Sequence, residues 1–230
     1  MTAPSAVGID TVSAALHRGA AAVLPNPAPL TYVVAATAPH AVNRAKARPA
    51  GQPVALWTHH PRTSDLVLRA LDLTPGAVRT ARRLLGEERV TLLAPLRPAG
   101  THPAWLGPAT HDGWTLLFGA RWSPLLPVLD EHPVLYVSSA NSTGRPPAPN
   151  AARARAMFPG HVPVLDAASL PGFVPDAPGS APRAATTTIR LHPDGHLEMH
   201  RSGAQDSAHH GPTAYLDHLR TVHGPGPASG

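Results

Sequence analysis

The feature that most constrains the fold is an alternation of short apolar segments with helix-like segments along most of the chain. The apolar segments are rich in Val, Leu and Thr and have the length of β-strands. We expect strands at 20–25, 31–38, 54–59, 89–96, 113–120, 133–137, 162–167, 186–192 and 196–201. The last two flank Pro193, Asp194 and Gly195, a strong hairpin signal. Strands that alternate with helices and end in a hairpin predict an α/β protein with a twisted, open, mixed β-sheet flanked by helices.

The length of 230 residues fits a single domain with an appendage. We expect residues 1–204 to form that domain, and residues 205–230 to form a partly disordered C-terminal tail. The tail holds one helix-like patch at 213–223. Because few apolar residues there can be buried, we expect deletion of residues 208–230 to leave thermal stability almost unchanged. The N-terminus has no signal-peptide pattern, and no apolar run reaches membrane-spanning length. We therefore expect a cytoplasmic protein with no membrane partner.

The charge of the chain favours anionic partners. Its formal net charge is +5, which suits nucleotides or RNA. Arg supplies all but one of the 19 basic residues, and the exception is Lys46. The absence of Cys excludes disulfides, thiolate catalysis and Cys-ligated metals.

Small polar side chains follow the buried strand predicted at 133–137. In open α/β sheets the carboxyl end of a strand is where ligands bind, and here Ser139 and Asn141 lie at that end. Lys46 and Arg48 follow another strand–helix unit. Two cations, a hydroxyl and an amide would suit a polyphosphate if they converge. Alternatively, the Ser and Asn residues form an ordinary turn and the basic pair is a solvated helix end. Neither common glycine-rich nucleotide fingerprint is present.

The order of these motifs resembles the YrdC-like family, the threonylcarbamoyl-adenylate synthases of tRNA modification. The K-x-R-P motif of that family matches residues 46–49, and its S-A-N-x-S-G-x-P-P motif matches residues 139–147, with Thr143 in place of Ser. Its late S-T-V-V strand resembles residues 187–190, and its closing R-x-G-A motif matches residues 201–204. Arg121 matches an Arg that the family carries before the S-A-N strand. The resemblance implies a single YrdC-like domain.

The resemblance implies an enzyme that uses ATP, Mg²⁺, bicarbonate and L-threonine to make threonylcarbamoyl-AMP and pyrophosphate. Lys46 and Arg48 would be catalytic. The implied phosphate- and nucleotide-binding residues are Ser139, Asn141, Arg121, Thr187 and Arg201. Thr31 and Tyr32 would contact the amino acid, and Mg²⁺ would bridge phosphates with no metal ligand from protein side chains. tRNA or double-stranded RNA is the further partner implied.

One family segment is poorly matched, which leaves other functions open. The P-T-D-T-V-Y-G-L motif is retained only at Pro25 and Tyr32, and its Asp and Gly are missing. Alternatives are therefore a non-catalytic module that binds double-stranded RNA or nucleotides, and a paralogue that acts on another amine. The basic cluster formed by Arg79, Arg82, Arg83 and Arg89 is either a solvated helix face or an RNA-contacting surface.

A metal site formed by histidines is not expected from the sequence, although the chain has 15 of them. His192, His196 and His200 recur at four-residue spacing. On a hairpin, however, His192 ends one strand and the other two lie along the next, so their spacing does not bring three ligands together.

Overall fold

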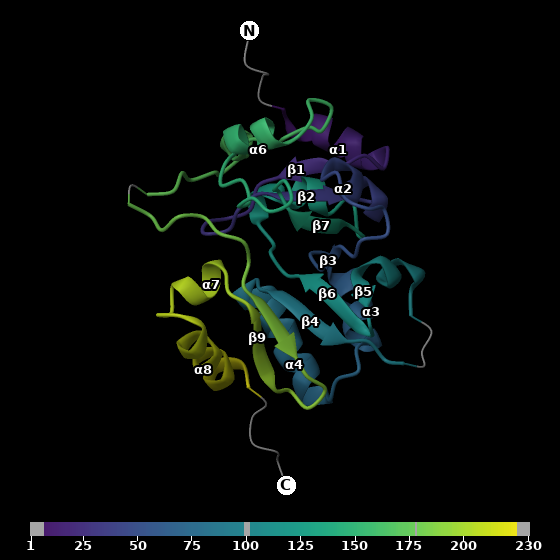
Figure 1. The fold of residues 1–230 in the computed structure, drawn as a ribbon, viewed down its shortest axis with the longest axis vertical. Coiled ribbons are helices and arrows are strands. Elements are labelled where there is room, and N and C mark those ends of the chain that lie inside the picture. Colours follow the sequence, from purple (N-terminus) through teal and green to yellow (C-terminus); the bar gives the residue numbers. More distant parts are fainter. Residues whose placement is uncertain (1–6, 99–101, 178, 225–230) are drawn as a thin grey trace. The chain divides into compact units, whose positions relative to one another are not determined.

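The computed structural model describes residues 7–98, 102–177 and 179–224 (Figure 1). The chain divides into two compact units, each built from two separate stretches of sequence. Unit 1 contains Met1–Val54 and Trp122–Ala185, and unit 2 contains Ala55–Arg121 and Thr186–Gly230.

Unit 1 is built on three antiparallel strands in the order β1-β2-β7. Their bounds are β1 (Ala22–Leu24), β2 (Val33–Ala36) and β7 (Tyr136–Ser139). All residues of β1 and β2 are buried, as expected for strands covered on both faces. The helices of this unit are α1 (Ile9–His17), α2 (Pro39–Ala45), α5 (Leu126–Leu129) and α6 (Ala151–Met157).

The strand predicted at 162–167 in this unit is wrong as a regular strand. Only isolated parallel bridges form there, from Val164 to Val23 and from Leu165 to Val7. The cause is Pro163, which has no N–H to donate to a ladder. Its carbonyl still accepts a bond of 2.8 Å from the Val23 N–H, so the segment runs along β1 without extending the sheet.

Unit 2 holds a mixed sheet in the order β3-β6-β4-β8-β9, with β5 paired to β6. The pairs β3/β6 and β4/β8 are parallel, and β4/β6, β5/β6 and β8/β9 are antiparallel. The strands are β3 (Ala55–Trp57), β4 (Thr91–Pro95), β5 (Thr110–His111), β6 (Trp114–Phe118), β8 (Thr188–Leu191) and β9 (Leu197–Arg201). The predicted α/β class and mixed sheet flanked by helices are confirmed.

The hairpin predicted at 193–195 is also confirmed. Gly195 has φ 97°, a backbone conformation that glycine adopts without steric cost. The His192 N–H donates to the His196 carbonyl at 3.0 Å and closes the turn between β8 and β9.

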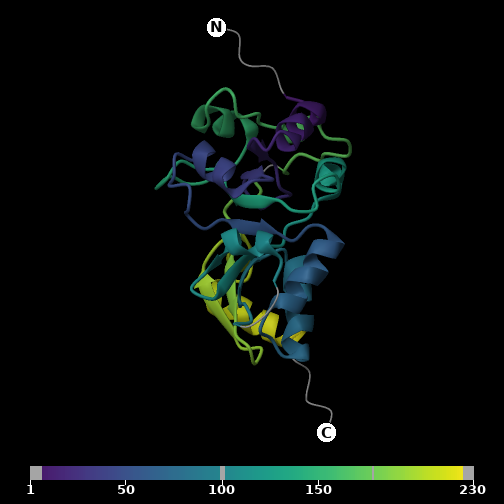
Figure 2. The same ribbon diagram turned by 90° about the vertical axis from the view of Figure 1, so that its right-hand side faces the viewer.

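Two helices of unit 2, α3 (Pro61–Ala70) and α4 (Pro75–Arg83), pack against each other, as the blue ribbons of Figure 2 show. A π-helical segment, Leu84–Glu88, continues α4. All four Arg residues of the basic cluster are exposed, and Arg82 pairs with Asp65 at 2.8 Å.

The C-terminal helix of unit 2 corrects our expectation for the tail. After α7 (Ala204–Ser207), α8 (Pro212–His223) packs against α7 and β9. Tyr215 and Leu219 are fully buried, and the Tyr215 hydroxyl donates to Glu88 at 3.1 Å. The helix-like patch is thus a packed helix, and the expectation that little of it is buried is wrong. The domain boundary at residue 204 stays a prediction, and the predicted disorder at 225–230 lies outside the described residues.

Among the described residues, no helix combines the length and the apolar character needed to cross a membrane.

Candidate functional site: a cationic cluster in unit 1

The turn after α2 positions Lys46 and Arg48. Ala47 between them has φ 51°, a left-handed conformation that is uncommon for a residue with a Cβ. Asn43, on α2, stabilises this turn: its carbonyl accepts from the Arg48 N–H at 2.9 Å, and its side-chain amide donates to the carbonyls of Ala50 and Gln52. Asn43 is fully buried. Sequence reasoning did not assign it, although an Asn three residues before a lone Lys is a usable signal.

The end of β7 supplies the partners of both cations. The Lys46 ammonium donates to the Ser139 carbonyl and, at 2.6 Å, to Asn141 Oδ1. The Ser139 hydroxyl donates to the same Asn141 oxygen at 2.7 Å. Arg48 Nη2 donates to Ser138 Oγ at 2.8 Å. The structure therefore brings together Lys46, Arg48, Ser139 and Asn141, about ninety residues apart in sequence, and adds Ser138 to them.

The partners reach Lys46 because of the way unit 1 is packed. α2 lies against both β2 and β7, which carries its C-terminal turn to the end of β7. β2 pairs with β7 so that Val33 lies opposite Ser139 and Val34 opposite Ser138. After the strand, the Asn141 amide donates to the Arg145 carbonyl at 2.7 Å, which closes the loop and orients the Asn141 oxygen.

The cluster carries positive charge without a compensating carboxylate. Lys46 is 6% exposed, and burial together with the neighbouring Arg48 lowers its pKa to about 7. Burial also lowers the pKa of Arg48. Across the described part of the chain, the side-chain hydrogen bonds of Lys46 and Arg48 all go to neutral oxygens, and no carboxylate forms an ion pair with either. Buried cations are normally paired, so this arrangement fits a site that receives an anion.

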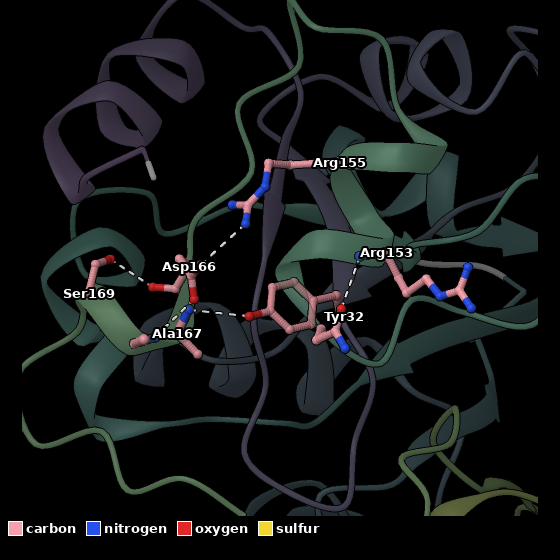
Figure 3. Close-up of polar contacts among 8 residues, drawn as sticks. Tyr32, Arg153, Arg155, Asp166, Ala167 and Ser169 are labelled. Carbon is pink, nitrogen blue, oxygen red and sulfur yellow. Dashed lines mark hydrogen bonds and ion pairs between the residues drawn. The ribbon is translucent and has the colours of Figure 1, made fainter. Parts of the chain in front are cut away.

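A cavity of about 540 Å³ opens elsewhere in unit 1, beside Tyr32. The Tyr32 hydroxyl accepts from the Ala167 N–H at 3.2 Å (Figure 3), and burial raises the pKa of this phenol. Arg155 and Asp166 line the cavity, and Arg155 Nη2 lies 3.5 Å from Asp166 Oδ2. Arg183 pairs with Asp176 at 2.7 Å at another part of the lining. The cavity is therefore lined by groups of both charges, which form ion pairs.

The two residues predicted to contact an amino acid differ in their placement. Tyr32 lines the cavity, but Thr31 is not among its described lining residues. Thr31 is buried, its N–H donates to the Ala184 carbonyl at 3.0 Å, and its own carbonyl accepts from the Asn26 amide at 2.9 Å. Thr31 thus fixes the loop before β2 through its backbone.

The other three predicted binding residues belong to unit 2. Arg121 is exposed. Thr187 is fully buried and donates through Oγ1 to Asp206 at 2.6 Å. Arg201 donates to the Thr186 carbonyl at 3.4 Å. Their place relative to the cationic cluster of unit 1, and hence their role, stays a prediction.

The cationic cluster does not offer a protein site for Mg²⁺. Its oxygens are neutral, and the Asn141 Oδ1 atom already accepts from an ammonium and a hydroxyl. Mg²⁺ prefers carboxylate, phosphate and water oxygens. These residues therefore do not fit a resident Mg²⁺ ion, and the metal would enter only as the complex of ATP.

Comparison with known proteins gives matches by structure but not by sequence. No family model matches the chain, and no curated protein matches its sequence. P. abyssi Sua5 in complex with L-threonine is similar with a TM-score of 0.60 and 19% identity, over 85% of this chain and 54% of that chain. E. coli YciO is similar with a TM-score of 0.62 and 13% identity, over 86% of this chain and 90% of that chain.

Full-length HypF in its phosphate- and nucleotide-bound form is also similar, with a TM-score of 0.59 and 15% identity. That match covers 89% of this chain but only 30% of HypF, and the chain spans about half the length of Sua5. The class that these matches define is an α/β protein with a mixed open sheet. More particularly, the chain has the YrdC-like fold of Sua5 and YciO.

Proposed function

We propose that the chain belongs to the YrdC-like family and is a nucleotidyltransferase of the threonylcarbamoyl-AMP synthase type. The observation that carries the proposal is the pair Lys46 and Arg48, buried or half-buried beside the end of β7 with no carboxylate partner among the described residues. A polyphosphate supplies the negative charge that this pair lacks. Fixed cations in a water-poor site act at low effective dielectric, where each stabilises an anion by several kcal/mol more than in water.

In the proposed reaction the amine of threonine and bicarbonate first give a carbamate and water. A carbamate oxygen then attacks the α-phosphorus of ATP, the bond to the bridging oxygen breaks, and pyrophosphate leaves. Both reactants are anions, so their approach is opposed unless cations lie between them. Lys46 and Arg48 take that role, and Ser138, Ser139 and Asn141 hold the cations. The Ser138 hydroxyl and the second N–H of the Asn141 amide can also donate to phosphate oxygens. No side chain is needed as a nucleophile.

The cavity beside Tyr32 is proposed to hold the amino acid. Its paired charges, Arg155 with Asp166 and Arg183 with Asp176, match the two charges of a zwitterion. The similar fold of Sua5, which was solved with L-threonine, supports threonine as the first amino acid to test. tRNA or double-stranded RNA is proposed as a downstream partner, in keeping with the net charge of +5.

The direct experiment is to incubate the protein with ATP, Mg²⁺, L-threonine and ¹³C-bicarbonate and to analyse the products by mass spectrometry. The proposal predicts an adenylate that contains threonine and one ¹³C atom. Repeating the reaction with each common amino acid identifies a different acceptor if threonine gives none. If no amino acid in the series gave a carbamoyl-adenylate, nucleotidyl transfer would be refuted.

A second candidate is a non-catalytic module that binds nucleotides or double-stranded RNA. The observation that favours it is the segment at 25–34, which lacks the Asp and Gly of the family motif. In this case ATP binding would be measurable by calorimetry and would depend on Lys46 and Arg48, but no pyrophosphate would form. A paralogue that acts on another amine is distinguished by the amino-acid series above.

A further inference from the structure

Two histidines and a glutamate of unit 1 lie together away from the residues assigned above. His17 is the last residue of α1, and Glu131 and His132 follow shortly after α5. α1 and α5 pack against each other, so this placement follows from the fold of the unit. The donor atoms of His17, Glu131 and His132 all lie within 4.8 Å of one another, and this is the one such group among the described residues.

The geometry points to a metal site, and we propose that His17, Glu131 and His132 bind one Zn²⁺ ion. Imidazole nitrogens and a carboxylate oxygen are donors that zinc accepts, usually in tetrahedral geometry with three protein ligands and one water. Metal–ligand distances of about 2.0–2.2 Å place neighbouring donors about 3.4 Å apart in a tetrahedron. His17 Nε2 and Glu131 Oε2 are already 3.3 Å apart.

The third donor distinguishes this group from an ordinary surface ion pair. The pair of His17 and Glu131 alone is exposed, and such pairs contribute little to stability. His132 is 5% exposed, and its ring centroid lies 4.5 Å from that of His17 at a tilt of 58°. The two exposed side chains beside this buried histidine are free of close packing, so their rotation can bring the donor atoms, now within 4.8 Å of one another, nearer to zinc distances.

Zinc at this site would connect two segments that are distant in sequence. It would join the C-terminal end of α1 to the segment that leads into β7, the strand that ends in Ser138 and Ser139. The cation would also lie at a helix C-terminus, where the helix dipole favours positive charge. The inference is independent of the proposed reaction, because it concerns residues that the cationic cluster does not include.

The test is isothermal titration of the full, tag-free chain with ZnCl₂ after treatment with a chelator. We expect one tight site per chain and at least about tenfold weaker binding in His17→Ala and in Glu131→Gln, since each removes one ligand. His40→Ala and Glu198→Gln are matched controls: His40 is exposed, and Glu198 pairs with His192 at 3.1 Å in the β8–β9 hairpin. Both controls should bind zinc as the wild type does, and MgCl₂ should not bind.

A second readout is spectroscopic. Co²⁺ in place of Zn²⁺ should give the d–d absorption bands of a tetrahedral site in the wild type and in both controls, but not in His17→Ala. Unchanged zinc affinity in the double variant His17→Ala/Glu131→Gln would overturn the proposal. Loss of binding in Glu198→Gln instead would move the site to the hairpin and would equally overturn it, as would the absence of any tight site in the wild type.

Discussion

Lys46 carries most of the functional argument at the scale of single residues. It is the only Lys in a chain that otherwise uses Arg, and it is buried against neutral oxygens. Its lowered pKa, about 7, means that the folded protein holds this proton less well than the unfolded chain does. A site that holds a cation at such a cost is ready for an anion, because a bound phosphate would restore the charge balance.

The first prediction follows from the lowered pKa of Lys46. Between pH about 7 and 10.5 the unfolded chain binds the Lys46 proton and the folded chain does not, so stability rises with pH across this window. Lys46→Met removes the buried charge. It should stabilise the protein by about 1 kcal/mol near pH 6. Above pH 7 the difference should move in favour of the wild type by up to about 1.4 kcal/mol per pH unit, so that the wild type is the more stable protein by about pH 8.

Urea unfolding of both proteins at several pH values measures this effect. Met keeps most of the aliphatic volume of Lys, so the comparison measures the loss of the buried ammonium together with its two hydrogen bonds. A Lys46→Met variant that is less stable than the wild type near pH 6, with the same pH profile, would show that Lys46 is not a destabilising buried charge.

The second prediction concerns Lys46→Arg, which keeps the charge but should lower the rate on the order of a hundredfold. The ammonium fits between the Ser139 carbonyl and Asn141 Oδ1, whereas a guanidinium is larger, planar and unable to occupy the same position. Steady-state kinetics measure the rate, and circular dichroism checks the fold. Arg44→Lys, which changes an exposed residue of α2, is the control and should leave the rate unchanged. Near wild-type turnover of Lys46→Arg would remove Lys46 from the catalytic role.

At the scale of elements, α8 is where sequence and structure differ most. Its Tyr215 is fully buried, and burial together with Glu88 raises the pKa of its hydroxyl. Glu88 also contacts His223 Nε2 at 2.7 Å, so one carboxylate of the π-helical segment holds two residues of α8. α8 therefore belongs to the core of unit 2.

The third prediction is that Tyr215→Ala destabilises the protein by about 3 kcal/mol, since it removes a large buried ring and the hydrogen bond that its hydroxyl donates to Glu88 Oε2. Val222→Ala, on the exposed side of the same helix, should change stability by less than about 0.5 kcal/mol. Thermal or urea unfolding measures both. A Tyr215→Ala variant as stable as the wild type would show that the packing of α8 does not stabilise unit 2.

Local chemistry explains which elements could be predicted. The β8–β9 hairpin could be predicted from Pro193, Asp194 and Gly195, because the turn residues fix the register next to the turn. The shift of register between Thr188 and Ile189, further along β8, could not. The packing of α8 could not be read from the sequence, because it depends on Glu88, which is 127 residues away from Tyr215 in the chain. The segment at 162–167 has the composition of a strand, but a single Pro keeps it out of the sheet.

Part of the candidate site, like part of the fold, could be predicted from the sequence. Four side chains from two distant motifs were expected to converge, and they do lie together in unit 1. The sequence could not show that Ser138, rather than Ser139, contacts Arg48, or that Asn43 supports the turn. Both facts depend on how α2 packs on the sheet. The cavity beside Tyr32 could not be predicted from the sequence either, because its lining comes largely from loops with no periodic pattern.

At the scale of the whole molecule, a YrdC-like fold carries two features in the same unit, a cationic cluster that we propose binds a polyphosphate and a separate cavity that we propose binds an amino acid. The fold alone does not determine the chemistry, since proteins of one fold often have different activities. The functional conclusion therefore depends on Lys46 and Arg48 and on the substrate that they receive.

The most direct test is pyrophosphate release by the purified chain with ATP, Mg²⁺ and bicarbonate, measured with and without L-threonine. The account predicts continuous release that requires both threonine and bicarbonate and is lost in Lys46→Ala. ATP binding detected by calorimetry, without pyrophosphate release in the presence of any common amino acid, would contradict it.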